Sequence, residues 1–434
     1  MLNMKDCFIY TIFIWLLIIN IGCTAEFKNG TSDIDEWNDG DTIDYVFNHP
    51  CLLHTNADFE RVKTKLQSNA QPWLMGYEKL VASPRAQKNY QPSPEEKVER
   101  PGQEKYRIFS ENGAAAYQLA LMWKITGDND YADASIRVLN SWAKKNKVLG
   151  GNDEKVLLAG FGGYQYANAA ELMRDYAGWQ HDDFEIFKQW LLSVVYPVCY
   201  DWMANHYGNP ANKAWMSWDL PAMTSALAIG IFTEDREKIN YVLDYFYNGG
   251  GGGCIKNSVI ARLEDPIGNI EGKHLAQSME VGRDQGHATL NVPLLAYFCQ
   301  MFLNVGVDLF SYDDHVVLDI CEYIAKYNVS PNEAIDMPFV RYYTNLEGWK
   351  EVISQNDNDQ GRGRARPGWE LIYNHYKKKA NPYYSREFAR TMRPEGGGNR
   401  GGAEPDDMGF GTLMYTVDPV ETGEDQAADP WRPY

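Results

Sequence analysis

The stretch FEIFKQWLLSVVYPV, residues 184–198, decides the fold class. Its apolar side chains recur every three or four residues: Phe184, Phe187, Leu191, Val194, Val195 and Val198. This spacing places them on one face of a helix, whereas a half-buried strand alternates apolar and polar residues. The stretch therefore predicts an amphipathic helix that packs against a core.

The same spacing returns on both sides of this stretch. REKINYVLDYFYNGG (236–250) ends in glycines, and HVVLDICEYIAKYNVSP (315–331) ends at a proline, as helix ends often do. NGAAAYQLALMWKITGD (112–128), YADASIRVLNSWAKK (131–145) and YQYANAAELMRDYAGW (164–179) fit the pattern too. Alternating strand segments are few, and no repeat of fixed period appears. Helical hairpins in series predict an all-α (α/α) toroid or barrel of six to seven hairpins, complete or open, with a solenoid as the alternative.

The first residues have the pattern of an export signal. A polar start with one lysine, MLNMKD, precedes the apolar run FIYTIFIWLLIINIGC, which is short for a membrane span. Residues 1–22 are therefore predicted to be a signal peptide. The small residue before Cys23 resembles a bacterial lipoprotein box, which predicts a lipid anchor at Cys23. Secretion with cleavage nearby is the alternative. We expect an exported protein, periplasmic or anchored to the outer membrane of a Gram-negative bacterium.

The rest of the chain divides by composition. Residues 23–45 are acidic and polar and are predicted to be a linker. Residues 46–395 hold the predicted helices and form the predicted toroid. Residues 396–434 are rich in glycine, proline and acids and are predicted to be an irregular tail. We expect a monomer.

The net charge of −18 argues against nucleic acid as a partner. An acidic protein that binds a polyanion must gather its cations locally, so the positions of the arginines are informative. Five cysteines remain after the signal: Cys51, Cys199, Cys254, Cys299 and Cys321. This odd number, without a CxxC pair, predicts neither a disulfide framework nor a zinc site. We expect no metal and no cofactor.

Chemically active side chains gather in five stretches. These are GYQYANAAELMR (163–174), WMSWDL (215–220), MEVGRDQGHATL (279–290), FVRYYTNLEGW (339–349) and GRGRARPGWELIYNHY (361–376). Arginine, histidine, tyrosine, asparagine and glutamine are the groups that β-elimination on a uronic-acid polymer requires. A base removes the C5 proton and an acid helps the C4 oxygen to leave, and these can be a histidine and a tyrosine or one tyrosine in both roles. Positive or hydrogen-bond-donating groups neutralise the C6 carboxylate.

The predicted catalytic residues are His287, Tyr342 and Arg283, and each also has a structural interpretation. His287 and Arg283 are four residues apart, so a helix places them on one face. His287 is alternatively a helix-capping or core histidine bonded to Asp284, and Arg283 alternatively pairs with Glu280 or Asp284. Tyr342 is alternatively a core aromatic residue.

The order of these stretches, together with HPCLLHTNADFERVK (49–63), resembles the alginate-lyase-type polysaccharide lyases. Within them the chain is most similar to polysaccharide lyase family 38, over about residues 46–380, and GRDQGH with RPGWELIYNHY is the most specific part. The resemblance implies an (α/α) toroid with a cleft and metal-independent β-elimination on alginate or glucuronan. It implies that a histidine and a tyrosine, best matched by His287 and Tyr342, share the acid and base roles, with Tyr343 as a competitor for the tyrosine role. It also implies carboxylate neutralisers or subsite residues at Arg283, Gln285 and Asn168.

We expect a substrate-binding set around these catalytic residues. It comprises Asn168, Tyr164, Trp218, Gln285, Tyr343, Arg341, Arg366, Tyr373 and His375. The partner is an anionic polysaccharide. Other alginate lyases of the superfamily carry an Asn-Asn-His run where this chain has Ser217-Trp218-Asp219. That departure favours His287 as the histidine and leaves glucuronan open as the substrate.

Two other functions remain open from the sequence. A glycoside hydrolase on a helical toroid needs two carboxyl groups, which Asp219, Asp284 and Glu370 can supply. A non-catalytic, surface-anchored glycan-binding lipoprotein fits the signal and the aromatic content.

Overall fold

The computed structural model describes residues 43–101, 105–265, 273–344, 350–352, 360–364, 366–397 and 406–426. The predicted signal peptide, Cys23 and nearly all of the predicted linker lie outside the described residues. Among the described helices, none is long and apolar enough to cross a membrane.

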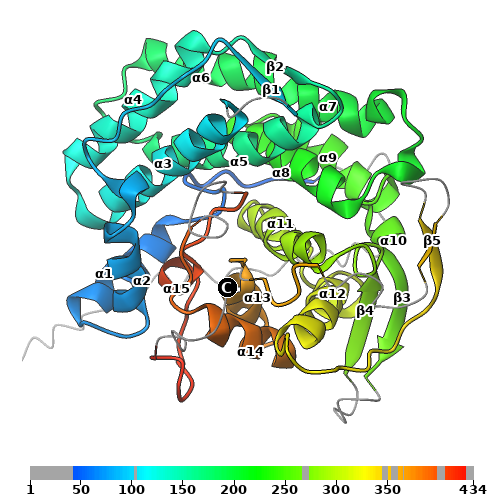
Figure 1. Ribbon diagram of the computed structural model, residues 1–434. Coiled ribbons are helices and arrows are strands. Elements are labelled where there is room, and N and C mark those ends of the chain that lie inside the picture. The colour runs from blue at the N-terminus through cyan, green and yellow to red at the C-terminus, as the bar shows by residue number, and fades with distance from the viewer. Residues whose placement is uncertain are drawn as a thin grey trace, which may run out of the picture.

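Helices follow one another around a ring (Figure 1). The first half holds α1 (Asn56–Gln67), α2 (Trp73–Val81), α3 (Lys105–Thr126), α4 (Asn129–Lys145), α5 (Lys155–Met173), α6 (His181–Trp190) and α7 (Tyr196–Asn205). The second half holds α8 (Met216–Phe232), α9 (Arg236–Asn248), α10 (Ile255–Ser258), α11 (Gln285–Asn304), α12 (Tyr312–Asn328), α13 (Trp369–Tyr376), α14 (Tyr383–Met392) and α15 (Gly411–Met414). Consecutive long helices pack against each other as hairpins, such as α3 with α4, α8 with α9, and α13 with α14. The predicted all-α toroid of helical hairpins is confirmed.

The inner and outer helices differ in sequence as their positions require. Helix α5 packs between α3 and α8, and its residues 156–173 are all buried. Its glycines permit close contact with α8, because a Cβ at Gly160 would lie 2.6 Å from Cβ of Pro221. Helices α4 and α9 instead keep one polar face, which fits a helix that covers the ring from outside.

The ring closes through the C-terminal segment. Residues 407–416 are buried, and α15 packs against α2 and α13. The approach to α2 is close, because a Cβ at Gly76 would lie 2.8 Å from the backbone nitrogen of Leu413. The segment was predicted to be an irregular tail outside the toroid. It contains few regular turns, but its aromatic and apolar residues, such as Phe410 and Leu413, fill the gap between the first and last hairpins.

In the described part of the chain, three small two-stranded sheets accompany the helices. Strands β1 (Lys97–Arg100) and β2 (Val148–Gly151) are parallel. Strands β3 (Val259–Glu264) and β4 (His274–Ser278) are antiparallel, as are β5 (Tyr342–Thr344) and β6 (Lys350–Val352). Strand β4 leads directly into the turn before α11, and β1 ends at Arg100. Both positions matter for the site.

Candidate active site

A cavity of about 330 Å³ lies where the inner helices meet the C-terminal segment. Its described lining comprises Arg100, Leu157, Phe161, Ser217, Trp218, Asp284, Gly286, His287, Leu290, Gln360, Gly361, Arg364, Arg366 and Asp406. Helices α5 and α8 supply apolar and aromatic side chains, whereas the loop after β6 supplies arginines. The three arginines outnumber the two acids of the lining. A cavity with an apolar wall and concentrated positive charge suits a sugar that carries a carboxylate.

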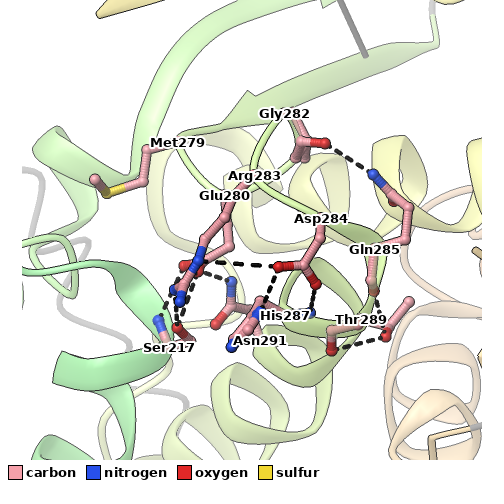
Figure 2. A network of polar contacts seen from close by, with 12 residues as sticks. Ser217, Met279, Glu280, Gly282, Arg283, Asp284, Gln285, His287, Thr289 and Asn291 are labelled. Atoms are coloured by element: carbon pink, nitrogen blue, oxygen red, sulfur yellow. Dashed lines mark hydrogen bonds and ion pairs between the residues drawn. The ribbon is translucent and has the colours of Figure 1, made fainter. Parts of the chain in front are cut away.

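His287 enters this cavity from the first turn of α11. The Asp284 side chain caps the helix, with Oδ1 accepting from the His287 backbone nitrogen at 2.9 Å, while Oδ2 lies 2.5 Å from His287 Nδ1 (Figure 2). The His287 side chain is 41 % exposed, and its Nε2 has no hydrogen bond to any described residue. In the neutral imidazole this arrangement puts the proton on Nδ1 and leaves the lone pair on Nε2. The predicted contact of His287 with Asp284 is confirmed, and it leaves a basic nitrogen at the cavity.

Asp284 is suited to hold that tautomer. Burial raises the pKa of its carboxyl, but the hydrogen bond and charge of His287 outweigh burial and bring the pKa below its ordinary value. Arg283 Nε, 3.9 Å from Asp284 Oδ2, adds to the lowering. Asp284 therefore stays ionised and fixes the imidazole ring.

Arg283 lies behind the cavity wall. Its Nη1 donates to Glu280 Oε1 at 2.8 Å and to Ser217 Oγ at 3.2 Å (Figure 2). The buried Glu280 also accepts from the backbone nitrogen and the hydroxyl of Ser217, at 3.0 and 2.9 Å. The guanidinium stacks over Trp215 at 5.0 Å. The predicted pairing of Arg283 with Glu280 is confirmed, and it ties the turn before α11 to the start of α8.

Tyr342 holds the other end of the same turn. Its hydroxyl donates to the Met279 carbonyl at 2.7 Å and accepts from the Gly282 backbone nitrogen at 3.2 Å. Its side chain is buried and does not line the cavity. Arg341 is exposed and also outside the lining, and the Tyr343 side chain is outside the described part of the chain. The described lining residues include no tyrosine.

Three predicted substrate-binding residues lie in the interior. Asn168 accepts from the Leu53 backbone nitrogen at 3.0 Å and donates to the Tyr164 carbonyl at 2.8 Å. The Tyr164 hydroxyl donates to the Asp406 carbonyl. Gln285 donates to the Val281 carbonyl at 2.8 Å. Asn168, Tyr164 and Gln285 are buried and do not line the cavity, so the structure places none of the three at its surface.

The two predicted residues of α13 also lie away from the cavity. Tyr373 is buried, and the His375 ring stacks on Phe310 with centroids 3.9 Å apart. Burial, aided by Lys379, lowers the pKa of His375 to about 3, so its imidazole is neutral. The structural interpretation of His375, as part of an amphipathic helix, fits this position.

Trp218 and Arg366 line the cavity. Arg366 is 4 % exposed, and its Nη1 donates to Asp406 Oδ2 at 3.1 Å. The Ser217-Trp218-Asp219 run therefore reaches the cavity through its first two residues. Asp219 points away from it, accepting from Trp202 Nε1 at 2.7 Å and from the Tyr245 hydroxyl at 2.8 Å.

The chain places Arg100, Arg364 and Asp406 at the cavity, where sequence reasoning assigned no role. The local sequence could have indicated Arg364, because it lies two residues before Arg366 in a loop rich in glycine and arginine. Its Nη1 lies 3.0 Å from the position that a Cβ on Gly286 would occupy, one residue before His287. Arg100 and Asp406 lie far away in sequence and have no local pattern that points to the cavity.

A further group of ligand-type atoms lies outside the cavity lining. Donor atoms of His49, Cys51 and Glu171 are within 4.8 Å of one another, which the sequence did not lead us to expect. Glu171 Oε1 already accepts from His49 Nδ1 at 2.6 Å and from the Cys51 backbone nitrogen at 2.9 Å. Its Oε2 accepts from Arg174 Nε at 3.1 Å. These contacts account for the carboxylate as a clamp that holds the first described segment against α5.

The hydrolase alternative loses two of its three predicted carboxyl groups. Asp219 is buried in the contacts given above. Glu370 is buried and pairs with Arg393, whose Nε donates to Oε1 at 2.7 Å. Only Asp284 of the three lines the cavity, and it is engaged with His287.

Comparisons with known proteins agree on one class. Alginate lyase A1-III from Sphingomonas species A1 is similar over 86 % of this chain and 97 % of that chain, with 15 % identity and a TM-score of 0.57. An alginate lyase from Bacteroides ovatus is similar over 85 % of this chain and 100 % of that chain, with 12 % identity and a TM-score of 0.55. These similarities establish the toroid fold.

Membership of a family follows from comparison of sequences. No match appears among curated proteins. The narrower similarity to polysaccharide lyase family 38 stays a prediction. The family model described as alginate lyase matches residues 57–334, which is more than half of the chain. The chain therefore belongs to the alginate lyase family and is a polysaccharide lyase.

Proposed function

We propose that this lyase cleaves alginate or a related uronan, such as glucuronan, by β-elimination, with His287 as the base. The observation that carries the proposal is the position of His287: its Nδ1 contacts Asp284, and its Nε2 is left for the arginine-lined cavity. The alginate lyases with a similar fold support the choice of alginate.

The reaction follows from these groups. Nε2 takes the C5 proton of the uronate, the electron pair of that bond forms the C4–C5 double bond, and the C4–O bond breaks. The leaving oxygen takes a proton from the imidazolium or from water. An imidazole suits this work, because histidine is the side chain that most often serves as a general base. No metal takes part in this scheme.

Charge on the C6 carboxylate is the main obstacle, because the intermediate carries a second negative charge. Arg364 supports its neutralisation, since its guanidinium approaches Gly286, next to His287 in the chain. Arg366 also lines the cavity and pairs with Asp406 there. Preorganised cations in such a site stabilise an enolate strongly. We therefore assign the neutralisation of the C6 carboxylate mainly to Arg364.

Arg283 and Tyr342 do not contact the substrate in this proposal. Both bind the turn of residues 279–284, Arg283 through Glu280 and Ser217, and Tyr342 through Met279 and Gly282. They are positioning residues, because they hold the turn that delivers Asp284 and His287. Gln285 has the same kind of role, because it donates to the Val281 carbonyl of this turn.

Mass spectrometry of products from a panel of uronans tests the proposal. Cleavage by elimination gives oligosaccharides with an unsaturated non-reducing end, which absorb ultraviolet light and are lighter by one water than hydrolysis products. Unsaturated products from alginate or glucuronan support the proposal. Saturated products, or no cleavage of any uronan by folded protein, would overturn it.

We also propose that the enzyme is exported from the cytoplasm. An enzyme for polymers too large to enter a cell needs to act outside the cytoplasm, and the sequence of residues 1–23 supports a signal peptide followed by a lipid anchor. Mass spectrometry of the mature N-terminus decides this point. A lipid-modified Cys23 at the mature N-terminus is the expected result, and an unprocessed Met1 would contradict it.

A further inference from the structure

We propose that Tyr106 and Arg107, together with Arg100, bind a second uronate of the polymer beside the cavity. The inference rests on the proposed function, and it adds a subsite to the cavity described above. Its members come from the end of β1 and the first turn of α3.

Arg100 connects the subsite to the cavity. It lines the cavity, and its side chain is 23 % exposed. Its Nε lies 3.4 Å from Glu154 Oε2, a long ion pair that leaves the Nη face of the guanidinium for other contacts. The guanidinium that lines the cavity therefore also reaches a neighbouring position beside it.

Tyr106 and Arg107 form that neighbouring position. The Cζ atoms of Arg100 and Arg107 lie 5.1 and 5.8 Å from the centroid of the Tyr106 ring, within cation–π range. Arg107 Nε lies 3.5 Å from the Tyr106 hydroxyl. Arg107 is exposed and Tyr106 is half-buried. Two guanidiniums are thus arranged around one aromatic ring at the surface.

This arrangement matches the chemistry of a uronate. A guanidinium binds a carboxylate with two parallel hydrogen bonds, and a tyrosine ring packs against the C–H face of a sugar. The net charge of the protein is −18, so two neighbouring arginines beside the cavity differ in sign from the protein as a whole. Because every sugar of a uronan carries a carboxylate, a chain seated in the cavity brings a second one near.

The test compares oligouronates of increasing length. In Arg107→Ala and Tyr106→Ala, the KM for long oligosaccharides is expected to rise about fivefold more than the KM for the shortest cleaved one, in line with an exposed ion pair. Arg107→Lys should retain part of the effect. Lys144→Ala removes an exposed cation that pairs with Asp183 on the outer face, and it serves as the charge-matched control. A loss that is equal at all lengths, or equal to that of Lys144→Ala, would overturn the subsite.

A binding measurement separates this inference from the proposed function. Isothermal titration calorimetry of saturated oligouronates on the wild-type protein and on Arg107→Ala needs no turnover. If the wild-type protein cleaves no uronan, the proposed function fails, yet weaker binding by Arg107→Ala still supports the subsite. If cleavage occurs and both proteins bind long oligosaccharides equally, only the subsite fails.

Discussion

His287 Nδ1 lies 2.5 Å from Oδ2 of Asp284, the same carboxylate that caps helix α11 through the His287 backbone nitrogen. One side chain thus fixes where the helix begins, which way the imidazole turns and which nitrogen carries the proton. The base is positioned by the start of the helix itself, and mutations can test each part of this arrangement separately.

Replacing His287 by alanine should reduce kcat by about 10²- to 10⁴-fold, the usual contribution of a general base. The fold should be unaffected, because the imidazole is partly exposed and the Asp284 cap bonds to the backbone. Initial rates of unsaturated-product formation measure the effect. His181→Ala, at an exposed position of α6, is the matched control. A kcat within threefold of the wild type (roughly 0.7 kcal/mol of barrier) would remove His287 from the mechanism.

Replacing Arg364 by alanine should lower kcat/KM by about 10²- to 10³-fold, the loss expected when a donor to a developing anion is removed. Lysine at this position keeps the charge and should recover part of the activity. Arg362→Ala is a control from the same loop, since Arg362 donates to backbone carbonyls of Tyr327 and Glu333 and does not line the cavity. A larger loss in Arg362→Ala than in Arg364→Ala would assign the loop a structural role only.

Tyr342→Phe separates positioning from proton transfer. The variant loses the hydroxyl bonds to Met279 and Gly282, so the free energy of unfolding should fall by about 1 kcal/mol. The hydroxyl does not line the cavity, so kcat should stay within about tenfold of the wild type. That loss is smaller than the loss expected when a general acid is removed. Urea unfolding and initial rates measure the two effects. Loss of activity as complete as in His287→Ala, with unchanged stability, would make Tyr342 the acid or base.

The His49–Glu171 pair predicts a pH dependence of stability. Burial lowers the pKa of His49, but the hydrogen bond and charge of Glu171 outweigh it and raise the pKa above its ordinary 6.5. Burial raises the pKa of Glu171, but its contacts with His49 and Arg174 bring it below its ordinary 4.5. The histidine contribution is complete below pH 6.5 and is lost as pH rises through its folded pKa. The glutamate contribution is complete above pH 4.5 and is lost as pH falls.

The pair should therefore stabilise the fold most between these two values. His49→Gln should cost about 1–2 kcal/mol at mildly acidic pH and less in alkaline solution. Thermal unfolding of both proteins across the pH range measures this difference, with His181→Gln as the control. A cost that is constant from acidic to alkaline pH would contradict the pairing.

Treatment with a strong chelator should leave the rate of elimination unchanged. Within the described residues, the only group of metal-ligand type found is His49, Cys51 and Glu171, and none of these lines the cavity. Loss of activity that an added divalent cation restores would show that the imidazole and guanidinium groups are not sufficient.

The sequence predicted the fold well because the helices of the ring share one pattern of apolar spacing. Helices such as α9 and α12 carry regular apolar spacing, and that spacing depends only on neighbours a turn away. The contact of Asp284 with His287 was predictable for the same reason, since it spans three residues. Local reasoning could not tell a tyrosine at the cavity from one beneath it, as Tyr342 demonstrates. Nor could it find Arg100, which only the ring brings close to His287.

The closure of the ring by α15 has a consequence for the order of events during synthesis. Residues 411–416 leave the ribosome long after α2, the helix that they cover. Asp406, beside them, supplies the carboxylate that Arg366 needs at the cavity. A nascent chain thus lacks both the complete cavity wall and the carboxylate partner of Arg366 until residues 406–416 have been made. Catalytic competence should appear only after residue 416 has been made, and deletion of residues 406–416 should abolish it.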